Sequence, residues 1–340
     1  MVNYSPVKLI EFVRDELVEQ EHFGFLVKVS PDKTIKTGDD KNYPFYLRSC
    51  AKPLQAALII DFGLDKYYKM TSEEIAVCCA SHAGEACHTD AVKSLLNKIG
   101  LDESYLKCGF HKPLSKKEQE KLVISGEKES IFQNNCSGKH VMMLGICLKN
   151  SWEWVNGDKY VNDGANNYTN LNHPLQIAIK NKIYELCEIK ENYPVTKDGC
   201  GVPIHSMPLE NMVKGYLNLF LSEKYKKIRD AFSKHPYIIG GEDRLDTAIM
   251  SANNRLIAKV GAGGLCIVVN LETQEGLIIK IMDCDMKARA ICLIETLHKI
   301  NWLDDNMMEN ELILNQNKKD ILTLHKEKVG SANVLFAGRG

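Results

Sequence analysis

The sequence predicts an α+β protein in which one antiparallel sheet is flanked by helices and carries an inserted helical lobe. Three β-prone runs, at 255–260, 265–271 and 276–282, are separated by short glycine-rich or polar turns. Such short connections favour antiparallel neighbours. A further strand is expected near the other end of the chain, at 23–30, and the patterns between these strands are helical. One sheet built from both ends of the chain therefore accounts for the pattern.

Each expected element has a local reason. The run at 23–30 alternates and is rich in branched and aromatic residues, and Pro31-Asp32 predicts the turn that ends it. Ser72, followed by Glu73 and Glu74, predicts the start of a helix that runs to about Ala80. We expect the other helices at 52–61, 88–99, 115–123, 138–149, 174–188, 207–233 (as two helices), 245–252 and 286–300.

These elements define one two-lobed domain over residues 1–340. Its sheet lobe is expected at about 20–48 and 254–300, and its helical lobe at about 49–253. A chain of this length can bury a substantial core, and its 44% hydrophobic and 26% charged residues are typical of a soluble globular protein.

The net charge of -1 argues against a nucleic-acid partner and favours a small-molecule one. No export signal is visible, and no apolar run approaches the roughly 20 residues that span a bilayer. We therefore expect a cytoplasmic protein, without a membrane partner, whose thiols are mostly reduced. None of its twelve cysteines forms a Cys-x-x-Cys pair, so most are expected to be small buried side chains.

Ser49 and Lys52 are the first candidates for chemistry. They lie three residues apart in the segment Arg-Ser-Cys-Ala-Lys-Pro, so on a helix they share one face and the lysine can reach the hydroxyl. Such a pair can supply a nucleophile and its base. The spacing alone does not identify a site, because Ser-x-x-Lys also occurs at Ser5/Lys8, Ser30/Lys33, Ser104/Lys107 and Ser125/Lys128.

A second polar cluster runs from Ser81 to Glu85, with His88 close behind. These side chains suit the wall of a polar pocket, and a Ser-His-Asp triad that uses His82 is a further possibility. The alternative is that Ser81 and Glu85 only cap the next helix.

Two further segments each present one cysteine. Cys136 lies in the run 134–140 with Lys139 and His140, and Cys200 lies in a tight glycine-flanked turn at 198–201. The two thiolates could share a zinc ion, or both cysteines could simply be buried. Gly138-Lys139 does not belong to a phosphate loop, because Gln133 stands where that motif needs a glycine.

Lys259 stands at the end of a predicted strand, just before Gly261 and Ala262. Glycine there would let a substrate approach the backbone closely. The alternative is that Lys259 is a solvated charge on an edge strand, as such lysines commonly are.

Together these segments resemble the L-asparaginases of the Rhizobium etli type, the asparaginase II family. The resemblance covers most of the chain, from about Arg48 to Gly264. The matching segments are 48–55, 81–85, 134–140, 198–203, His235-Pro236, Gly240-Gly241 with Arg244 and Asp246-Thr247, and Lys259 with Gly261-Ala262. The resemblance implies a fold like that of serine β-lactamases and penicillin-binding proteins, in which Ser-x-x-Lys opens a helix.

The resemblance also implies an activity, L-asparaginase, and a set of roles. Ser49 with Lys52, and Ser81 with Lys259, form two catalytic Ser-Lys pairs. One zinc ion per chain falls on Cys136, Lys139 and Cys200 and supports substrate binding rather than activating water; Lys139 must be neutral to bind it. The chain is expected to be a homodimer. The residues expected to bind substrate are Arg48, His82, Glu85, Asn135, Gly261 and Ala262.

The chain departs from the family pattern at two places, with Gly263 where a glutamate is expected and Val141-Met142-Met143 where small residues are expected. These changes bear on substrate preference more than on reaction type. The alternatives are a glutaminase or another β-lactamase-like amidohydrolase, and a non-catalytic protein of the same fold that binds zinc or an amino acid. A metallohydrolase and a thiol hydrolase that uses Cys136 are two further hypotheses.

Overall fold

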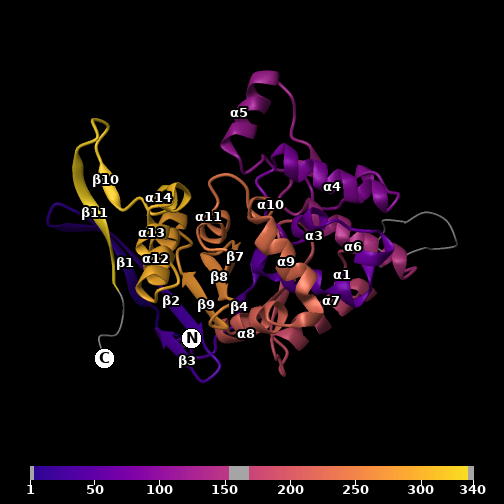
Figure 1. Cartoon of the computed structure of the whole chain (residues 1–340), viewed down its shortest axis with the longest axis horizontal. Coiled ribbons are helices and arrows are strands. Elements are labelled where there is room, and N and C mark those ends of the chain that lie inside the picture. Colours follow the sequence, from indigo (N-terminus) through magenta and orange to yellow (C-terminus); the bar gives the residue numbers. More distant parts are fainter. Residues whose placement is uncertain (1–3, 153–167, 336–340) are drawn as a thin grey trace. The chain divides into compact units, whose positions relative to one another are not determined.

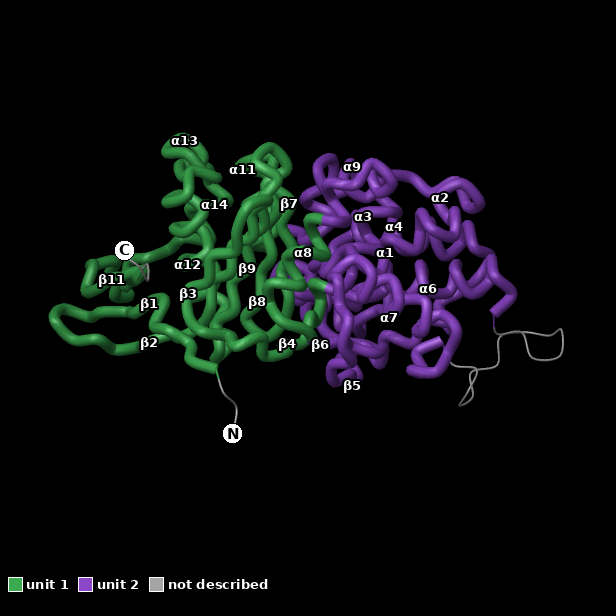
Figure 2. Tube along the Cα trace, turned by 90° about the horizontal axis from the view of Figure 1, so that it is seen from below, with its two compact units in different colours: residues 1–50, 207–217, 243–340 green, residues 51–206, 218–242 purple. Residues whose placement is uncertain are grey.

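The structure is a computed structural model that describes residues 4–152 and 168–335 (Figure 1). The chain divides into two compact units (Figure 2). Unit 1 comprises Met1–Cys50, Met207–Leu217 and Asp243–Gly340, and unit 2 comprises Ala51–Ser206 and Asn218–Glu242. The first boundary between the units thus falls between Ser49 and Lys52.

Unit 1 contains an antiparallel sheet whose strands differ in length (Figure 1). The strand order is β10-β11-β1-β2-β9-β8-β7, and β3 pairs with β2. Strands from both ends of the chain meet in it, because β2 pairs with β9 and β1 pairs with β11. This confirms the predicted α+β class. The strands are β1 (Val7–Arg14), β2 (Leu17–Val29), β3 (Thr34–Thr37), β7 (Leu256–Gly261), β8 (Leu265–Asn270), β9 (Glu275–Ile281), β10 (Asp320–Leu322) and β11 (Lys328–Val334).

The β9-β8-β7 end of this sheet is buried. Every residue of β7 and β8, and all but the first of β9, is buried, as expected for strands covered on both faces. Helix α12 packs against β9, and α11 packs against β7. The remaining elements of unit 1 are β4 (Phe45–Tyr46), η1 (Arg48–Cys50), the first part of α8 (Leu209–Phe220), α11 (Leu245–Ala252), α12 (Met286–Lys299), α13 (Asp305–Met308) and α14 (Glu311–Gln316).

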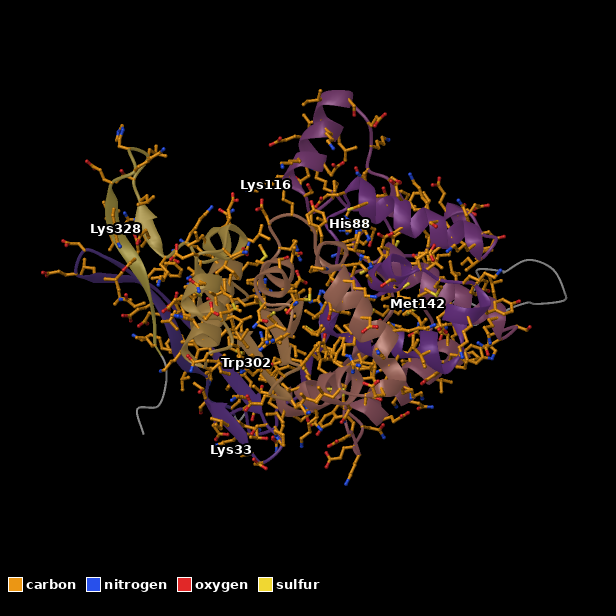
Figure 3. The ribbon with its side chains drawn as sticks, in the orientation of Figure 1. Lys33, His88, Lys116, Met142, Trp302 and Lys328 are labelled. Atoms are coloured by element: carbon orange, nitrogen blue, oxygen red, sulfur yellow. The ribbon has the colours of Figure 1, made fainter. Side chains whose placement is uncertain are left out.

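Unit 2 is helical and is built around α1, α3 and α6, which contact one another. Helix α6 is buried from Ser137 to Cys147, and Figure 3 shows Met142 among its side chains. A Cβ atom on Gly138 would lie 2.3 Å from the Val77 carbonyl oxygen, so only glycine lets α6 approach α3 this closely.

The helices of unit 2 are α1 (Ala51–Asp61), α2 (Leu64–Tyr67), α3 (Ser72–Cys79), α4 (Ala86–Lys98), α5 (Lys116–Ser125), α6 (Ser137–Lys149), α7 (Pro174–Leu186), α9 (Lys226–Lys234) and α10 (Pro236–Ile239). The short turns η2 (Glu103–Tyr105), η3 (Ile131–Gln133) and η5 (Glu223–Tyr225) join them, and β5 (Val195–Lys197) pairs with β6 (Pro203–Met207).

The expected helices are present within a few residues of their predicted ends, with one correction at α3. Its N-cap is Thr71, not Ser72. The Thr71 hydroxyl accepts from the Glu74 amide at 3.2 Å, and the Glu74 carboxylate accepts from the Thr71 amide at 2.8 Å. The two residues therefore form a capping box one position earlier than predicted.

Candidate active site

The turn that carries Ser49 is anchored inside unit 1. The Cys50 thiol donates to the Lys259 carbonyl at 3.4 Å, and the Tyr216 hydroxyl donates to the Cys50 carbonyl at 2.7 Å. Arg48 has a φ of 49°, a left-handed conformation that costs a non-glycine residue energy and often marks a functional turn. Ser49 is thus held on a constrained turn beside β7, the strand that carries Lys259.

Gly261 makes this close approach possible. A Cβ atom at this position would lie 2.8 Å from the Cys50 sulfur, so a side chain would push β7 away from the Ser49 turn. Burial raises the pKa of the Cys50 thiol to about 11, and the cysteine next to Ser49 is therefore a neutral thiol.

Lys259 is fully buried although β7 is the last strand of its sheet, so its interpretation as a solvated edge charge is wrong. Its ammonium donates to the Val260 carbonyl at 2.8 Å and lies 3.5 Å from a carboxylate oxygen of Asp246. That carboxylate is also fully buried and accepts from the Val260 amide at 3.3 Å. The strand therefore carries an internal ion pair.

Lys52 and Ser81 meet in unit 2. Lys52 is 2% exposed, and its Nζ lies 2.7 Å from the Ala80 carbonyl oxygen, 2.8 Å from the Asn135 carbonyl oxygen and 3.1 Å from the Ser81 hydroxyl. Lys52 donates to both carbonyls and to the Ser81 hydroxyl, and these three contacts fix the position of its amine.

The catalytic pairs predicted from the resemblance each join the two units. Ser49 and Lys259 belong to unit 1, and Lys52 and Ser81 belong to unit 2. Both pairings therefore stay predictions. Burial nevertheless distinguishes the five Ser-x-x-Lys matches, because Lys52 is the one lysine among them that is buried; the others are Lys8, Lys33, Lys107 and Lys128.

His82 is buried beside this pair and has a defined tautomer. Its Nε2 lies 3.0 Å from the Ser137 hydroxyl, which donates to the Phe132 carbonyl at 3.0 Å and so accepts from the ring. The proton therefore sits on Nε2. Burial lowers the pKa of His82 well below its usual range, which keeps the ring neutral. Its role in substrate binding stays a prediction.

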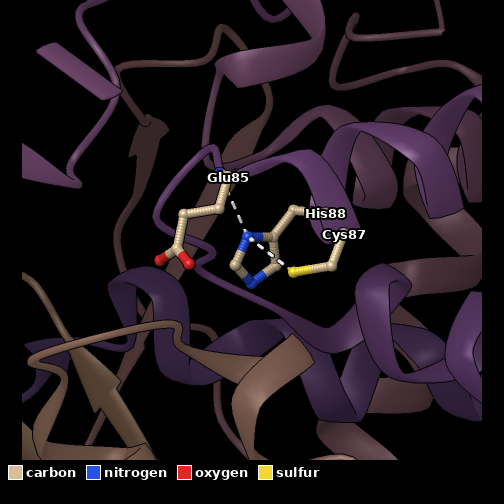
Figure 4. A group of neighbouring side chains, drawn as sticks. All are labelled: Glu85, Cys87 and His88. Carbon is tan, nitrogen blue, oxygen red and sulfur yellow. Dashed lines mark hydrogen bonds between the residues drawn. The ribbon is translucent and has the colours of Figure 1, made fainter. Parts of the chain in front are cut away.

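Glu85, Cys87 and His88 form a group whose donor atoms lie within 4.8 Å of one another (Figure 4). Both ring nitrogens of His88 are already engaged, because Nδ1 accepts from the Glu85 amide at 3.2 Å and Nε2 lies 3.1 Å from the Tyr237 carbonyl. The Glu85 carboxylate binds the Tyr237 hydroxyl and accepts from the Glu242 amide at 3.0 Å. This arrangement starts α4 and ties it to the segment before Asp243, which accounts for the group without a metal.

The three predicted zinc ligands lie together in unit 2. Cys136 is the N-cap residue of α6, Lys139 lies on its first turn, and Cys200 lies on the turn between β5 and β6. The Lys139 Nζ lies 2.9 Å from the Cys200 sulfur. Hydrogen bonding from the Cys136 thiol, aided by the Lys139 charge, lowers the pKa of Cys200 to about 4. The same bond and burial raise the pKa of Cys136 to about 12.

This donor set fits zinc, which binds cysteine sulfur and nitrogen ligands. Burial opposes a charge on Lys139, but the neighbouring cysteines outweigh burial and raise the pKa of the lysine. Binding a metal through its nitrogen would therefore require Lys139 to release a proton. The raised pKa of Cys136 also argues against this residue as a thiolate nucleophile.

Two residues near these groups had no assigned role in the sequence analysis. Asp246 belongs to a matching segment, but it lies on α11 and contacts Lys259 on β7. No local sequence pattern indicates this contact. The His111 ring accepts from the Asn135 amide at 3.0 Å and so helps to hold the residue whose carbonyl bonds Lys52. All twelve cysteines lie in the described ranges and none forms a disulfide, and all but Cys87 and Cys284 are buried.

A family model for L-asparaginase II matches residues 10–334 of the chain. A match over this length defines the protein as an amidohydrolase of the asparaginase class, which acts on a small molecule. More specifically, the chain belongs to the L-asparaginase II family, as the sequence resemblance predicted. Comparison with curated proteins gives no match. No helix in residues 4–152 and 168–335 is long and apolar enough to cross a membrane.

Proposed function

We propose that this protein hydrolyses the side-chain amide of L-asparagine to L-aspartate and ammonia through an ester intermediate on Ser49. Membership in the L-asparaginase II family supports the reaction class. The observation that carries the mechanism is the buried Lys52 amine, held by two carbonyls against a serine hydroxyl. A lysine must be neutral to act as a general base, and burial favours the neutral form of a lysine.

The proposed reaction passes one proton between the serine, the lysine and the leaving group. Lys52 takes the proton of Ser49 as its oxygen attacks the amide carbon, and that proton passes to the leaving nitrogen. Ammonia departs and leaves an aspartyl ester on Ser49. Water then attacks the ester and gives a proton to Lys52, which passes it to the departing Ser49 oxygen, so that L-aspartate leaves and the serine is regenerated. Ser81 and Lys259 act as the second Ser-Lys pair and relay protons to the leaving group, and backbone amides near Ser49 and Ala262 stabilise the oxyanion.

Ammonia release from asparagine and glutamine tests the substrate. We expect kcat/KM for asparagine to exceed that for glutamine by roughly 10- to 200-fold, since one methylene in a pocket is worth about this much. The measurement compares both amides at equal enzyme concentration. Faster release from glutamine would replace this substrate assignment with glutaminase, and release from neither would contradict the proposed function.

Zinc on Cys136, Lys139 and Cys200 is part of the proposal, and its support is the close set of one nitrogen and two sulfur donors. When bound, the ion supplies a fixed positive charge that helps to organise the substrate. We expect the Cys200→Ser variant to lose its zinc, as measured by metal analysis of the purified protein after dialysis.

Cys87→Ser is the matched control for this experiment, because Cys87 belongs to the other candidate cluster. We expect that variant to keep one zinc ion per chain. Zinc retained by Cys200→Ser but lost by Cys87→Ser would move the metal to the group at Glu85, Cys87 and His88.

A further inference from the structure

Unit 1 contains a cavity of about 290 Å³ whose wall includes Arg48, an expected substrate contact, and Ala262, where the proposed mechanism places an oxyanion donor; its other lining residues have no part in the proposed steps. Its walls come from four places: the N-terminal segment, the stretch leading into η1, the turn between β7 and β8, and strand β9. The lining residues that matter here are Tyr4, Tyr43, Phe45, Arg48, Gly263 and Lys280. The volume is close to the lower end of the range for small-molecule sites.

One wall of this cavity is aromatic and already assembled. The ring centroids of Tyr4 and Tyr43 lie 4.8 Å apart, those of Tyr43 and Phe45 lie 5.0 Å apart, and those of Tyr4 and Phe45 lie 6.0 Å apart. Rings that pack on one another in this way form a fixed apolar surface. A flat or apolar ligand body could lie against it without first ordering the side chains.

A positively charged group faces the same cavity: Lys280 on β9, which is only 8% exposed. Its ammonium donates to the Gly263 carbonyl at 2.6 Å and to the Ile281 carbonyl at 2.9 Å, and it lies 5.9 Å from the Phe45 ring. Within residues 4–152 and 168–335, no carboxylate oxygen lies within ion-pair distance of it. Two carbonyls use two of its three hydrogens, so one hydrogen is left for a ligand.

Residue 263 adds no side chain beside the Lys280 ammonium. Gly263 has a φ of +78°, and a Cβ atom built on it would meet nothing within 4 Å. Arg48 places a second basic side chain on the cavity wall. Burial lowers the pKa of Lys280 despite the nearby Asp283, and an anion that reached its ammonium would offset the cost of burying this charge.

We propose that this cavity binds a small carboxylate with an aromatic or apolar body. The carboxylate takes the remaining hydrogen of Lys280 on the side of the cavity that Arg48 also lines, and the body packs on the rings of Tyr4, Tyr43 and Phe45. The inference depends only on residues of unit 1 and does not rest on the proposed function. Binding is therefore measured on the Ser49→Ala protein, which removes turnover from the experiment.

Isothermal titration with three probes tests both parts of the site. Phenylacetate carries the ring and the charge, benzyl alcohol lacks the charge, and acetate lacks the ring. We expect phenylacetate to bind at least about 10-fold more tightly than either of the others, because a hydrogen bond to a charged group alone is worth about this factor. Equal binding of phenylacetate and benzyl alcohol would overturn the proposal.

Variants of Lys280 and Gly263 test whether phenylacetate binds in this cavity. Lys280→Met should weaken phenylacetate binding by about 10- to 100-fold. Gly263→Glu should weaken it similarly by placing a carboxylate beside Lys280, whereas Gly263→Ala imposes the same backbone strain without charge and should keep the affinity. Circular dichroism confirms that each variant is folded. Unchanged affinity in Lys280→Met, or equal affinity in Gly263→Glu and Gly263→Ala, would place the probe elsewhere and refute the site.

Discussion

Replacing Ser49 with alanine is expected to lower the rate of ammonia release from asparagine by more than about 1,000-fold, because loss of a catalytic serine removes the covalent route altogether. The substitution removes one oxygen from a turn whose bonds are made by its neighbours. Those bonds join Cys50 to Lys259 and Tyr216. We therefore expect the variant to fold normally and to keep its affinity for L-aspartate, so that the loss appears in kcat rather than in KM.

Another serine of the same spacing provides the control. Ser125 precedes Lys128 by three residues but lies exposed at the end of α5, and Ser125→Ala should turn over at the normal rate. Mass spectrometry of acid-quenched enzyme should find the aspartyl group on the peptide that contains Ser49. An aspartyl group on Ser81 would instead make Ser81 the nucleophile and Lys52, which contacts it directly, its base.

Local sequence patterns predicted most of this fold. The predicted elements are those whose apolar residues recur as expected for a helix or a buried strand. Strands β7 to β9 are mostly apolar runs, and the amphipathic helix α12 begins one residue after Asp285, its N-cap. The strands at the sheet's other side were not predicted. In β1, charged residues lie between apolar ones, and Lys8 pairs with Glu11 and Glu21 along the exposed face. Only pairing with β2 and β11 shows such a segment to be a strand.

The candidate site shows the same division between local and distant information. The order of the segments at Ser49, Ser81, Cys136, Cys200 and Lys259 indicates the family, and the family match supports it. The sequence does not show that Lys52 is 2% exposed, or that its amine meets the carbonyls of Ala80 and Asn135, because these contacts join segments far apart in the chain. The resemblance assigned Lys259 a partner in Ser81, whereas its carboxylate neighbour Asp246 is visible only in the structure.

Asp246→Asn is expected to lower the free energy of unfolding by about 3–5 kcal/mol, the usual cost of removing one partner of a buried ion pair. Both side chains are fully buried, so water cannot replace the lost carboxylate charge at the Lys259 ammonium. Asparagine can still accept from the Val260 amide, which confines the change to charge. Urea denaturation followed by circular dichroism measures the effect, and Asp243→Asn, an exposed position three residues away, should stay within about 0.5 kcal/mol of the wild type.

The double variant Asp246→Asn/Lys259→Met tests whether the two side chains stabilise the fold as an ion pair or independently of each other. If the two charges depend on each other, removing both leaves no uncompensated charge, and the double variant should be less destabilised than the sum of the single ones by about 1–3 kcal/mol. Strict additivity, or a cost below about 1 kcal/mol for Asp246→Asn, would show that Lys259 does not need this carboxylate. A large coupling would instead mean that Asp246 holds Lys259 in place, as its proposed role in proton relay requires, while Lys52 is the proposed base.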